Sequence, residues 1–177
     1  MAKLRFTART LPVTGVVLLA IGAASSTTDA ATATSNLSVT ASVAANCSIS
    51  TAPVAFGAYD PVSTNATTPL SGTGTVNVTC TNGASTTVTL GQGSNANTGS
   101  TDAAPARRLS DGGTNFLTYS LFQDAGHTTV WGNTGGTGVA NTGTGTQTAI
   151  TVYGTVAAGQ NVPSGNYSDT VVATVTF

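Results

Sequence analysis

The strongest constraint on this chain is a two-residue alternation of apolar and polar side chains, which recurs in short runs. At 37–43 the odd positions carry Leu, Val, Ala and Val, and the even positions carry Ser or Thr. Similar runs lie at 76–80, 88–90, 148–156 and 171–177. Alternate residues of a strand point to opposite faces, and Val and Thr suit a pleated surface. These runs therefore predict β-strands.

Helical spacing of apolar residues is not found in any long run beyond the first thirty residues. A further apolar strand is predicted at 116–122, with Val130 and Trp131 as its short partner. Turn-forming segments rich in Gly, Asn and Ser separate the runs, at 91–99, 111–113 and 132–145. Short strands with such turns predict an all-β sandwich or barrel. We expect the Gly/Thr-rich segment 133–147 to be a mobile loop.

Residues 1–30 have the features of a secretory signal peptide. Three cations stand near the start: Lys3, Arg5 and Arg9. The apolar stretch 11–24 that follows is shorter than the ~17–25 residues of a membrane-spanning helix, and small residues come after it. We expect cleavage after Ala30, or as late as Ala33. The mature chain is then exported, with no stable membrane insertion after cleavage.

The mature chain has very few charged side chains. Two cations remain, Arg107 and Arg108, against five aspartates and no glutamate. Such a surface cannot neutralise many phosphates, so nucleic acids and anionic membranes are not expected partners. Solubility must come from the abundant hydroxyl and amide groups, which suits an extracellular material.

Cys47 and Cys80 are the two cysteines of the chain. An even number of cysteines in an exported protein predicts a disulfide. Closing this loop would stabilise the fold by roughly 3–4 kcal/mol in the chain-entropy model. A metal site would need more ligands than two cysteines and one histidine, and a nucleophilic cysteine would need a paired base.

Residues that could perform chemistry are few and dispersed. The single histidine, His127, lies in a predicted turn, and Asp60 before a proline is expected to make a turn hydrogen bond. No calcium-loop or G-x-S-x-G pattern occurs. Trp131 and Tyr119 are expected in the core, although they could line a sugar platform, and Tyr167 is a candidate corner tyrosine. We expect no enzyme activity, no cofactor and no metal.

The two ends of the mature chain indicate exchange of strands between molecules. The amphipathic run 34–43 has no partner close in sequence, and the chain stops at Phe177 on a predicted strand. Free strand edges pair readily with another chain, and strand addition is an established recognition mode. We therefore expect a spare strand at 31–45 and a β domain at 46–177.

Several motifs, in order along the mature chain, resemble the spore coat protein U domain family, which includes major subunits of archaic chaperone–usher pili. They are ANCSI (45–49), FGAYDP (56–61), VNVTC (76–80), LTYSLFQD (117–124), TVWG (129–132), VYGT (152–155), VPSGNYSD (162–169) and VTF (175–177).

The resemblance implies an incomplete immunoglobulin-like β-sandwich that lacks its last strand. In such pilins a periplasmic chaperone first fills the gap, and at the outer-membrane usher the N-terminal strand of the next subunit replaces it. By the resemblance, the donor side chains are Leu37, Val39, Ala41 and Val43. The disulfide joins Cys47 to Cys80. The acceptor groove and chaperone-docking residues are Val171, Ala173, Val175 and Phe177.

The expected function is therefore that of a structural subunit of a surface pilus, which serves adhesion or biofilm formation. Its expected partners are copies of itself, a chaperone and an usher. One alternative is a secreted spore or cell coat protein that forms no pili, which predicts a domain completed by its own segment 34–43. Another is a carbohydrate-binding tip adhesin, although these usually carry an additional domain.

Overall fold

The computed structural model describes residues 28–177, so almost all of the predicted signal peptide lies outside the described residues. The chain divides into two units, Met1–Thr40 and Ala41–Phe177. Among the described residues no helix is long and apolar enough to cross a membrane.

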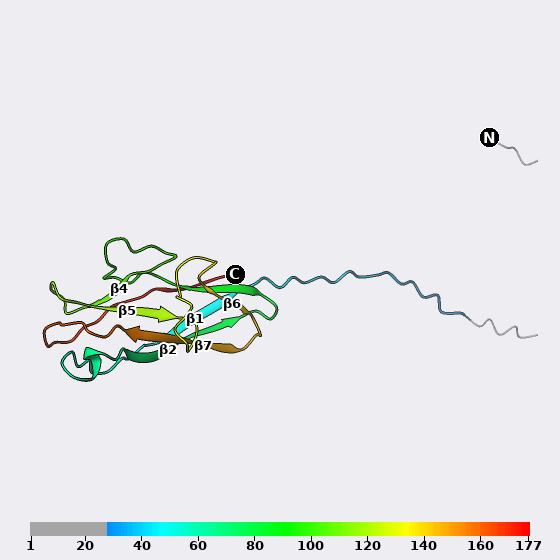
Figure 1. Ribbon diagram of the computed structural model, residues 1–177. Helices are drawn as coiled ribbons and strands as arrows, with labels where there is room; N and C mark the ends of the chain where they lie inside the picture. Colours follow the sequence, from blue (N-terminus) through cyan, green and yellow to red (C-terminus); the bar gives the residue numbers. More distant parts are fainter. Residues whose placement is uncertain (1–27) are drawn as a thin grey trace, which may run out of the picture. The chain divides into compact units, whose positions relative to one another are not determined.

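Residues 28–46 form neither helix nor strand (Figure 1). The apolar side chains of this segment are exposed: Leu37 to 87%, Val39 to 83% and Val43 to 86%. The strand predicted at 31–45 is therefore not formed in the single chain. A strand requires a neighbour for its main-chain N–H and C=O groups, and without one an extended segment has little stability of its own.

The domain Ala41–Phe177 consists of eight strands and one short 3-10 turn, η1. The elements are β1 Cys47–Ala52, η1 Thr64–Ala66, β2 Leu70–Cys80, β3 Ser85–Leu90, β4 Arg107–Ser110, β5 Phe116–Phe122, β6 Val139–Thr142, β7 Gln147–Val156 and β8 Ala173–Thr176. One sheet has the order β1-β2-β7-β5-β4 and the other the order β6-β3-β8, with antiparallel pairing throughout. The all-β, immunoglobulin-like sandwich predicted from the sequence is confirmed.

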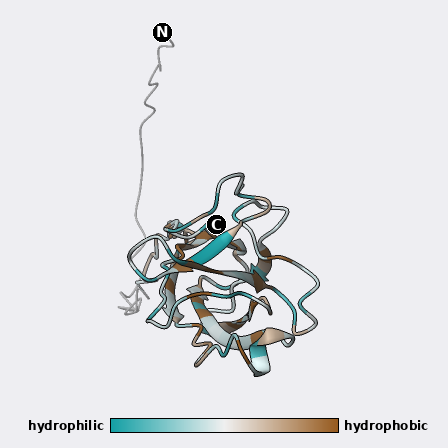
Figure 2. Ribbon diagram, turned by 60° about the vertical axis from the view of Figure 1, so that its left-hand side comes forward, coloured by the Kyte–Doolittle hydropathy of each residue, from teal (hydrophilic) through white to brown (hydrophobic). Residues whose placement is uncertain are grey.

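The longest pairing joins β2 to β7, from Leu70 opposite Val156 to Thr79 opposite Gln147. The fully buried positions of both strands hold valines, glycines and Cys80, whereas most of the outward side chains carry hydroxyl or amide groups. Figure 2 shows the resulting change between hydrophobic and hydrophilic colour along the strands. The predicted alternation therefore sets which face of the sheet is buried.

Trp131 is the largest fully buried side chain, and its indole N–H donates to the carbonyl oxygen of Val88 at 2.9 Å. Its neighbour Val130 pairs with Phe122 through a single β-bridge. Tyr119 is also buried. The core positions predicted for these two aromatic residues are confirmed, and so is the short pairing next to 116–122.

Three predicted turn features are present. The Asp60 carboxylate accepts hydrogen bonds from the main-chain N–H groups of Val62 and Ser63, each at 3.0 Å. His127 lies in a turn with φ of 53°. The hydroxyl of Tyr167 donates to the carbonyl oxygen of Pro163 at 2.9 Å, as a corner tyrosine does.

The segment 133–147 differs from its prediction as a mobile loop. It contains β6, which pairs with β3 from Ser85 opposite Thr142 to Val88 opposite Val139. Gly138 makes this approach possible, because a Cβ at that position would lie 2.8 Å from the Val88 carbonyl oxygen. Glycine here allows close packing of a strand, which the composition alone did not distinguish from a loop.

Candidate functional site: a groove between two free strand edges

The domain has two strand edges that face one gap. β1 is an edge of the five-stranded sheet and β8 is an edge of the three-stranded sheet. The two strands lie close to each other, but no ladder joins them in the described residues. Figure 1 shows the C-terminus, just after β8, beside the start of β1. The sandwich is therefore unclosed on this side.

Between the end of β1 and the start of β8 lies a cavity of about 270 Å³. Its floor is the inner face of the five-stranded sheet, where Val76, Leu121 and Val152 are buried. Its walls come from two segments: residues 51–56 on the β1 side and 169–173 on the β8 side. The floor is apolar, so a strand placed here could bury apolar side chains.

A second cavity of about 720 Å³ adjoins the first, bounded by 54–61 on one side and 162–169 on the other. The two cavities share four lining residues: Val54, Phe56, Leu109 and Asp169. They therefore form one groove, which we call the acceptor groove. It begins between the end of β1 and the start of β8 and continues between the segments 54–61 and 162–169, beyond both strands.

Glycines in β2 and β7 set the wall of the groove on the β1 side. A Cβ at Gly74 would lie 2.7 Å from the Val54 side chain, and one at Gly154 would lie 2.8 Å from the Phe56 ring. The segment after β1 can therefore lie directly on the sheet. The Phe56 ring then meets Tyr119 edge to face, with centroids 5.9 Å apart.

One charged group, Asp169, lines both cavities. One of its carboxylate oxygens accepts a hydrogen bond from the Tyr119 hydroxyl at 2.7 Å, and the other accepts from the main-chain and side-chain N–H groups of Asn95, each at 3.1 Å. Burial, with this bond, raises the pKa of Tyr119, which keeps the phenol neutral. Both carboxylate oxygens are thus engaged within the domain.

Of the four residues predicted to line the acceptor groove, two are among its lining residues and two are not. Val171 and Ala173 line the cavity between β1 and β8. Val175 is half-buried against the core, while Phe177 is 55% exposed. The strand itself is shorter than the run 171–177, since β8 covers Ala173–Thr176.

The donor residues Leu37, Val39, Ala41 and Val43 lie in the segment that has no secondary structure. Their role as donors stays a prediction.

The disulfide between Cys47 and Cys80 is present. It joins the first residue of β1 to the last residue of β2, which are directly opposite in the ladder. The predicted pairing is confirmed. The bond holds the exposed edge strand β1 to the central sheet.

Prediction from the sequence missed the wall residues Val54 and Phe56 and the floor residue Leu109. A signal for the wall existed: Gly72 and Gly74 stand inside a strand, where glycine often marks a close approach of another backbone.

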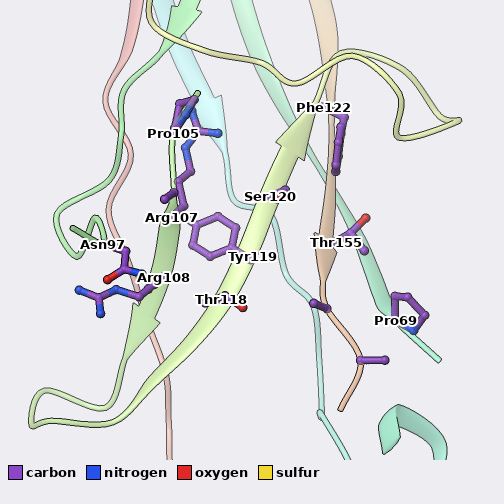
Figure 3. A pocket seen from close by; sticks show the side chains of 13 residues that line it. Pro69, Asn97, Pro105, Arg107, Arg108, Thr118, Tyr119, Ser120, Phe122 and Thr155 are labelled. Carbon is purple, nitrogen blue, oxygen red and sulfur yellow. The ribbon is translucent and has the colours of Figure 1, made fainter. Parts of the chain in front are cut away.

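A separate cavity of about 350 Å³ lies beside β4 and β5 (Figure 3). Arg107 and Arg108 line it from β4, and Thr118 and Tyr119 line it from β5. Arg107 donates to three main-chain carbonyl oxygens, and Arg108 donates to those of Asn95 and Ala96 while it lies over the Phe116 ring. These contacts within the domain give the arginines a structural role. In residues 28–177 no three His, Cys, Asp or Glu side chains gather to hold a metal ion.

Known proteins share the sequence and the fold of this chain. Residues 33–174 match the family described as the Spore Coat Protein U domain. Protein U of Myxococcus xanthus is 46% identical over 156 residues, which cover 84% of this chain and 87% of that protein.

A solved structure with a similar fold is described as the CsuC–CsuE chaperone–tip adhesion subunit pre-assembly complex from archaic chaperone–usher Csu pili of Acinetobacter baumannii. The TM-score is 0.53 at 21% sequence identity, and the match covers 76% of this chain. It spans 40% of the Csu chain. At this identity the likeness concerns the fold.

Proposed function

The chain belongs to the spore coat protein U domain family, and from this premise we propose that it is a structural subunit of a surface fibre that assembles by strand exchange. In this proposal, the N-terminal segment of one copy fills the acceptor groove of the next. The protein has no enzymatic role.

The observation that carries the proposal is the acceptor groove between the free edges of β1 and β8. Free edges on both sides of a gap offer unpaired N–H and C=O groups to an inserted strand. The apolar floor between them can bury every second side chain of that strand. A groove with these two properties suits a strand better than a small molecule.

The donor proposed for this groove is the segment 31–45. Residues 37–43 extend over roughly 23 Å as a strand, and their apolar side chains all lie on one face. Leu37, Val39 and Val43 are almost fully exposed in the single chain. Burying such aliphatic side chains contributes roughly 1.5–3 kcal/mol each before the cost of ordering the segment.

An unfilled apolar groove favours aggregation, so the subunit needs a temporary cover before assembly. We propose that a periplasmic chaperone provides this cover and that an outer-membrane usher exchanges it for the next subunit. The Csu structure of similar fold is a complex of a subunit with its chaperone, which supports this partner. The assembled fibre is then located at the cell surface, where it serves adhesion or biofilm formation.

A second candidate function is that of a coat protein that forms no pili. It is favoured by the description of the family and by the 46% identity to Protein U. This function predicts a monomer whose own segment 34–43 fills its own groove.

Deletion of residues 31–43 in the native cells tests the proposal. The truncated subunit should still bind its chaperone, because its groove is unchanged, but it should form no fibres by electron microscopy. Unboiled SDS gels should lose the ladder of multimers.

A pair of matched variants tests the face of the donor. Leu37→Asp with Val39→Asp should abolish the ladder, since charges would enter the apolar groove. Ser38→Asp with Thr40→Asp adds the same charge to the polar face and should preserve the ladder of multimers.

If the variant that lacks residues 31–43 still formed fibres, strand exchange through this segment would be wrong.

A further inference from the structure

The N-terminal segment is hydrogen-bonded to the domain where it meets β1. The N–H of Asn46 donates to the Thr81 hydroxyl at 3.0 Å, and the N–H of Thr81 donates to the Asn46 carbonyl at 2.9 Å. The Thr81 hydroxyl has one proton to donate, and its oxygen lies 3.3 Å from the Asn46 carbonyl oxygen and 3.4 Å from that of Ala44. The next residue, Cys47, forms the disulfide. At most two residues, Ala44 and Ala45, therefore separate the donor residue Val43 from chain that is bonded to the domain.

The end of the domain at which this attachment lies, here called the root end, consists of the turns 81–84 and 143–146. They hold each other through hydrogen bonds: Gly83 N–H donates to the Gly143 carbonyl and Gly145 N–H to the Cys80 carbonyl, both at 2.9 Å. Neither turn contains a charged residue. The root end is thus an uncharged, well-bonded surface.

The opposite end, here called the far end, includes the loop 59–66 before β2. Val62 in this loop is 88% exposed, although the loop around it is firmly held. The Asp60 carboxylate accepts from the main-chain N–H groups of Val62 and Ser63, and the buried Asn65 side chain bonds to the main chain of Asp60 and Thr68. Because the loop is already ordered, a contact made by Val62 would cost little conformational entropy.

The geometry of a fibre decides which end of the next copy the donor enters. If two copies joined root end to root end, the contact would be symmetric and would close as a dimer. An open fibre needs a head-to-tail contact, so the donor of one copy enters the groove of the next at its far end. Because the attachment at Asn46 leaves at most two free residues after Val43, the root end of the first copy then comes against the far end of the second.

On this basis, which rests on the proposed strand exchange, we propose a second contact between neighbouring copies of this chain. In it the Val62 loop of one copy packs on the turns 81–84 and 143–146 of its neighbour. The contact buries Val62 and brings no like charges together, because the root-end turns are uncharged. The contact fixes the angle between adjacent domains.

New cysteine pairs test the contact, because a disulfide forms only between close thiols. Val62→Cys with Asn82→Cys, and separately Val62→Cys with Thr144→Cys, should give a covalent ladder on boiled, non-reducing gels of fibres. These three positions are exposed, so the substitutions leave the core intact. The matched control, Val130→Cys with Asn82→Cys, should give no covalent ladder, since Val130 lies away from the far end, opposite Phe122.

Two gel conditions separate the two proposals. A multimer ladder on unboiled gels without a covalent ladder from either Val62 pair would overturn the end-to-end contact and leave strand exchange standing. Absence of the unboiled ladder from the unaltered protein would overturn strand exchange and this contact with it.

A variant with a longer, flexible linker between the N-terminal segment and the domain tests the role of the attachment. Insertion of Gly-Ser-Gly-Ser between Ala44 and Ala45 should reduce the yield of the covalent ladder severalfold and preserve the unboiled ladder, because a longer flexible linker lowers the effective concentration of the two ends. An unchanged covalent yield would show that the fixed attachment does not bring the ends together.

Discussion

At the scale of single residues, Arg107 connects the two sheets of the sandwich. It comes from β4 and is 1% exposed, yet its guanidinium donates to the carbonyl oxygens of Leu90, Gly91 and Trp131 at 2.8–2.9 Å. Burial lowers its pKa to about 10, so the group remains charged at neutral pH. One cation thus donates hydrogen bonds to carbonyl oxygens of the other sheet and of loop residues.

Replacing Arg107 by Met should destabilise the domain by roughly 2–4 kcal/mol, because two buried carbonyl oxygens and one partly buried one lose their donor. Urea unfolding of the purified protein measures this change. Arg108→Met is the matched control. Its guanidinium is less buried, and the expected loss is below about 1.5 kcal/mol. Equal losses for the two variants would contradict the special role of Arg107.

Gly154 permits the close packing of Phe56 that forms a wall of the acceptor groove. Gly154→Ala should destabilise the domain by roughly 1–3 kcal/mol, since the added methyl group would overlap the Phe56 ring and Val54. Thermal unfolding of the purified variant measures this destabilisation. Gly135→Ala should be nearly neutral, because nothing lies within 4 Å of a Cβ there. If Gly154→Ala left the stability unchanged, the wall formed by Phe56 would be able to move.

At the scale of elements, the edge strand β1 depends on two connections. Five of its six residues are exposed, so burial of apolar surface contributes little to its position. It is held by its ladder to β2 and by the disulfide at its first residue. The position of β1 therefore rests on a covalent bond and main-chain hydrogen bonds.

Cys47→Ser with Cys80→Ser should cost roughly 2–4 kcal/mol of stability. Loss of the bond should also raise hydrogen exchange within Cys47–Ala52 more than within β5, whose pairing on both sides is unchanged. Exchange followed by mass spectrometry gives this comparison. Uniform acceleration across both strands would show that the bond stabilises the domain as a whole and has no local effect on β1.

The strands that could be predicted are those whose alternation reflects burial. The predicted strand 116–122 coincides with β5, and 148–156 coincides with β7 to within one residue. The missed strands lack this pattern: β1 is mostly exposed, β4 contains a buried arginine, and β6 lies among glycines. Their positions come from contacts with distant strands, which a local pattern does not contain.

The acceptor groove could be predicted only in part for a similar reason. The β8 wall, with Val171 and Ala173, was implied by the family resemblance, whereas the alternating run 171–177 by itself predicted only a strand. The opposite wall depends on Val54 and Phe56 lying over glycines that are about twenty to one hundred residues away in sequence. That arrangement becomes visible only when the strands are placed side by side.

At the scale of the whole molecule, the scarcity of basic residues has a measurable effect on proteolysis. Beyond Arg9 the chain offers trypsin two sites, Arg107 and Arg108, and both belong to β4. The folded mature protein should resist trypsin, because cleavage would require β4 to leave the sheet. Heat-unfolded, reduced protein should be cut into two main fragments, as a gel of timed samples would show. Rapid cutting of the folded protein would mean that β4 opens readily.

The gap between β1 and β8 has a consequence for any row of copies joined by strand exchange. Each copy brings one acceptor groove and one donor segment, and a row uses one fewer of each than it has members. One tip therefore always ends in a vacant groove and the other in an unused strand. The two tips are chemically different, so growth has a direction. A protein that possessed a groove without a donor segment, or the reverse, would stop it at one tip only.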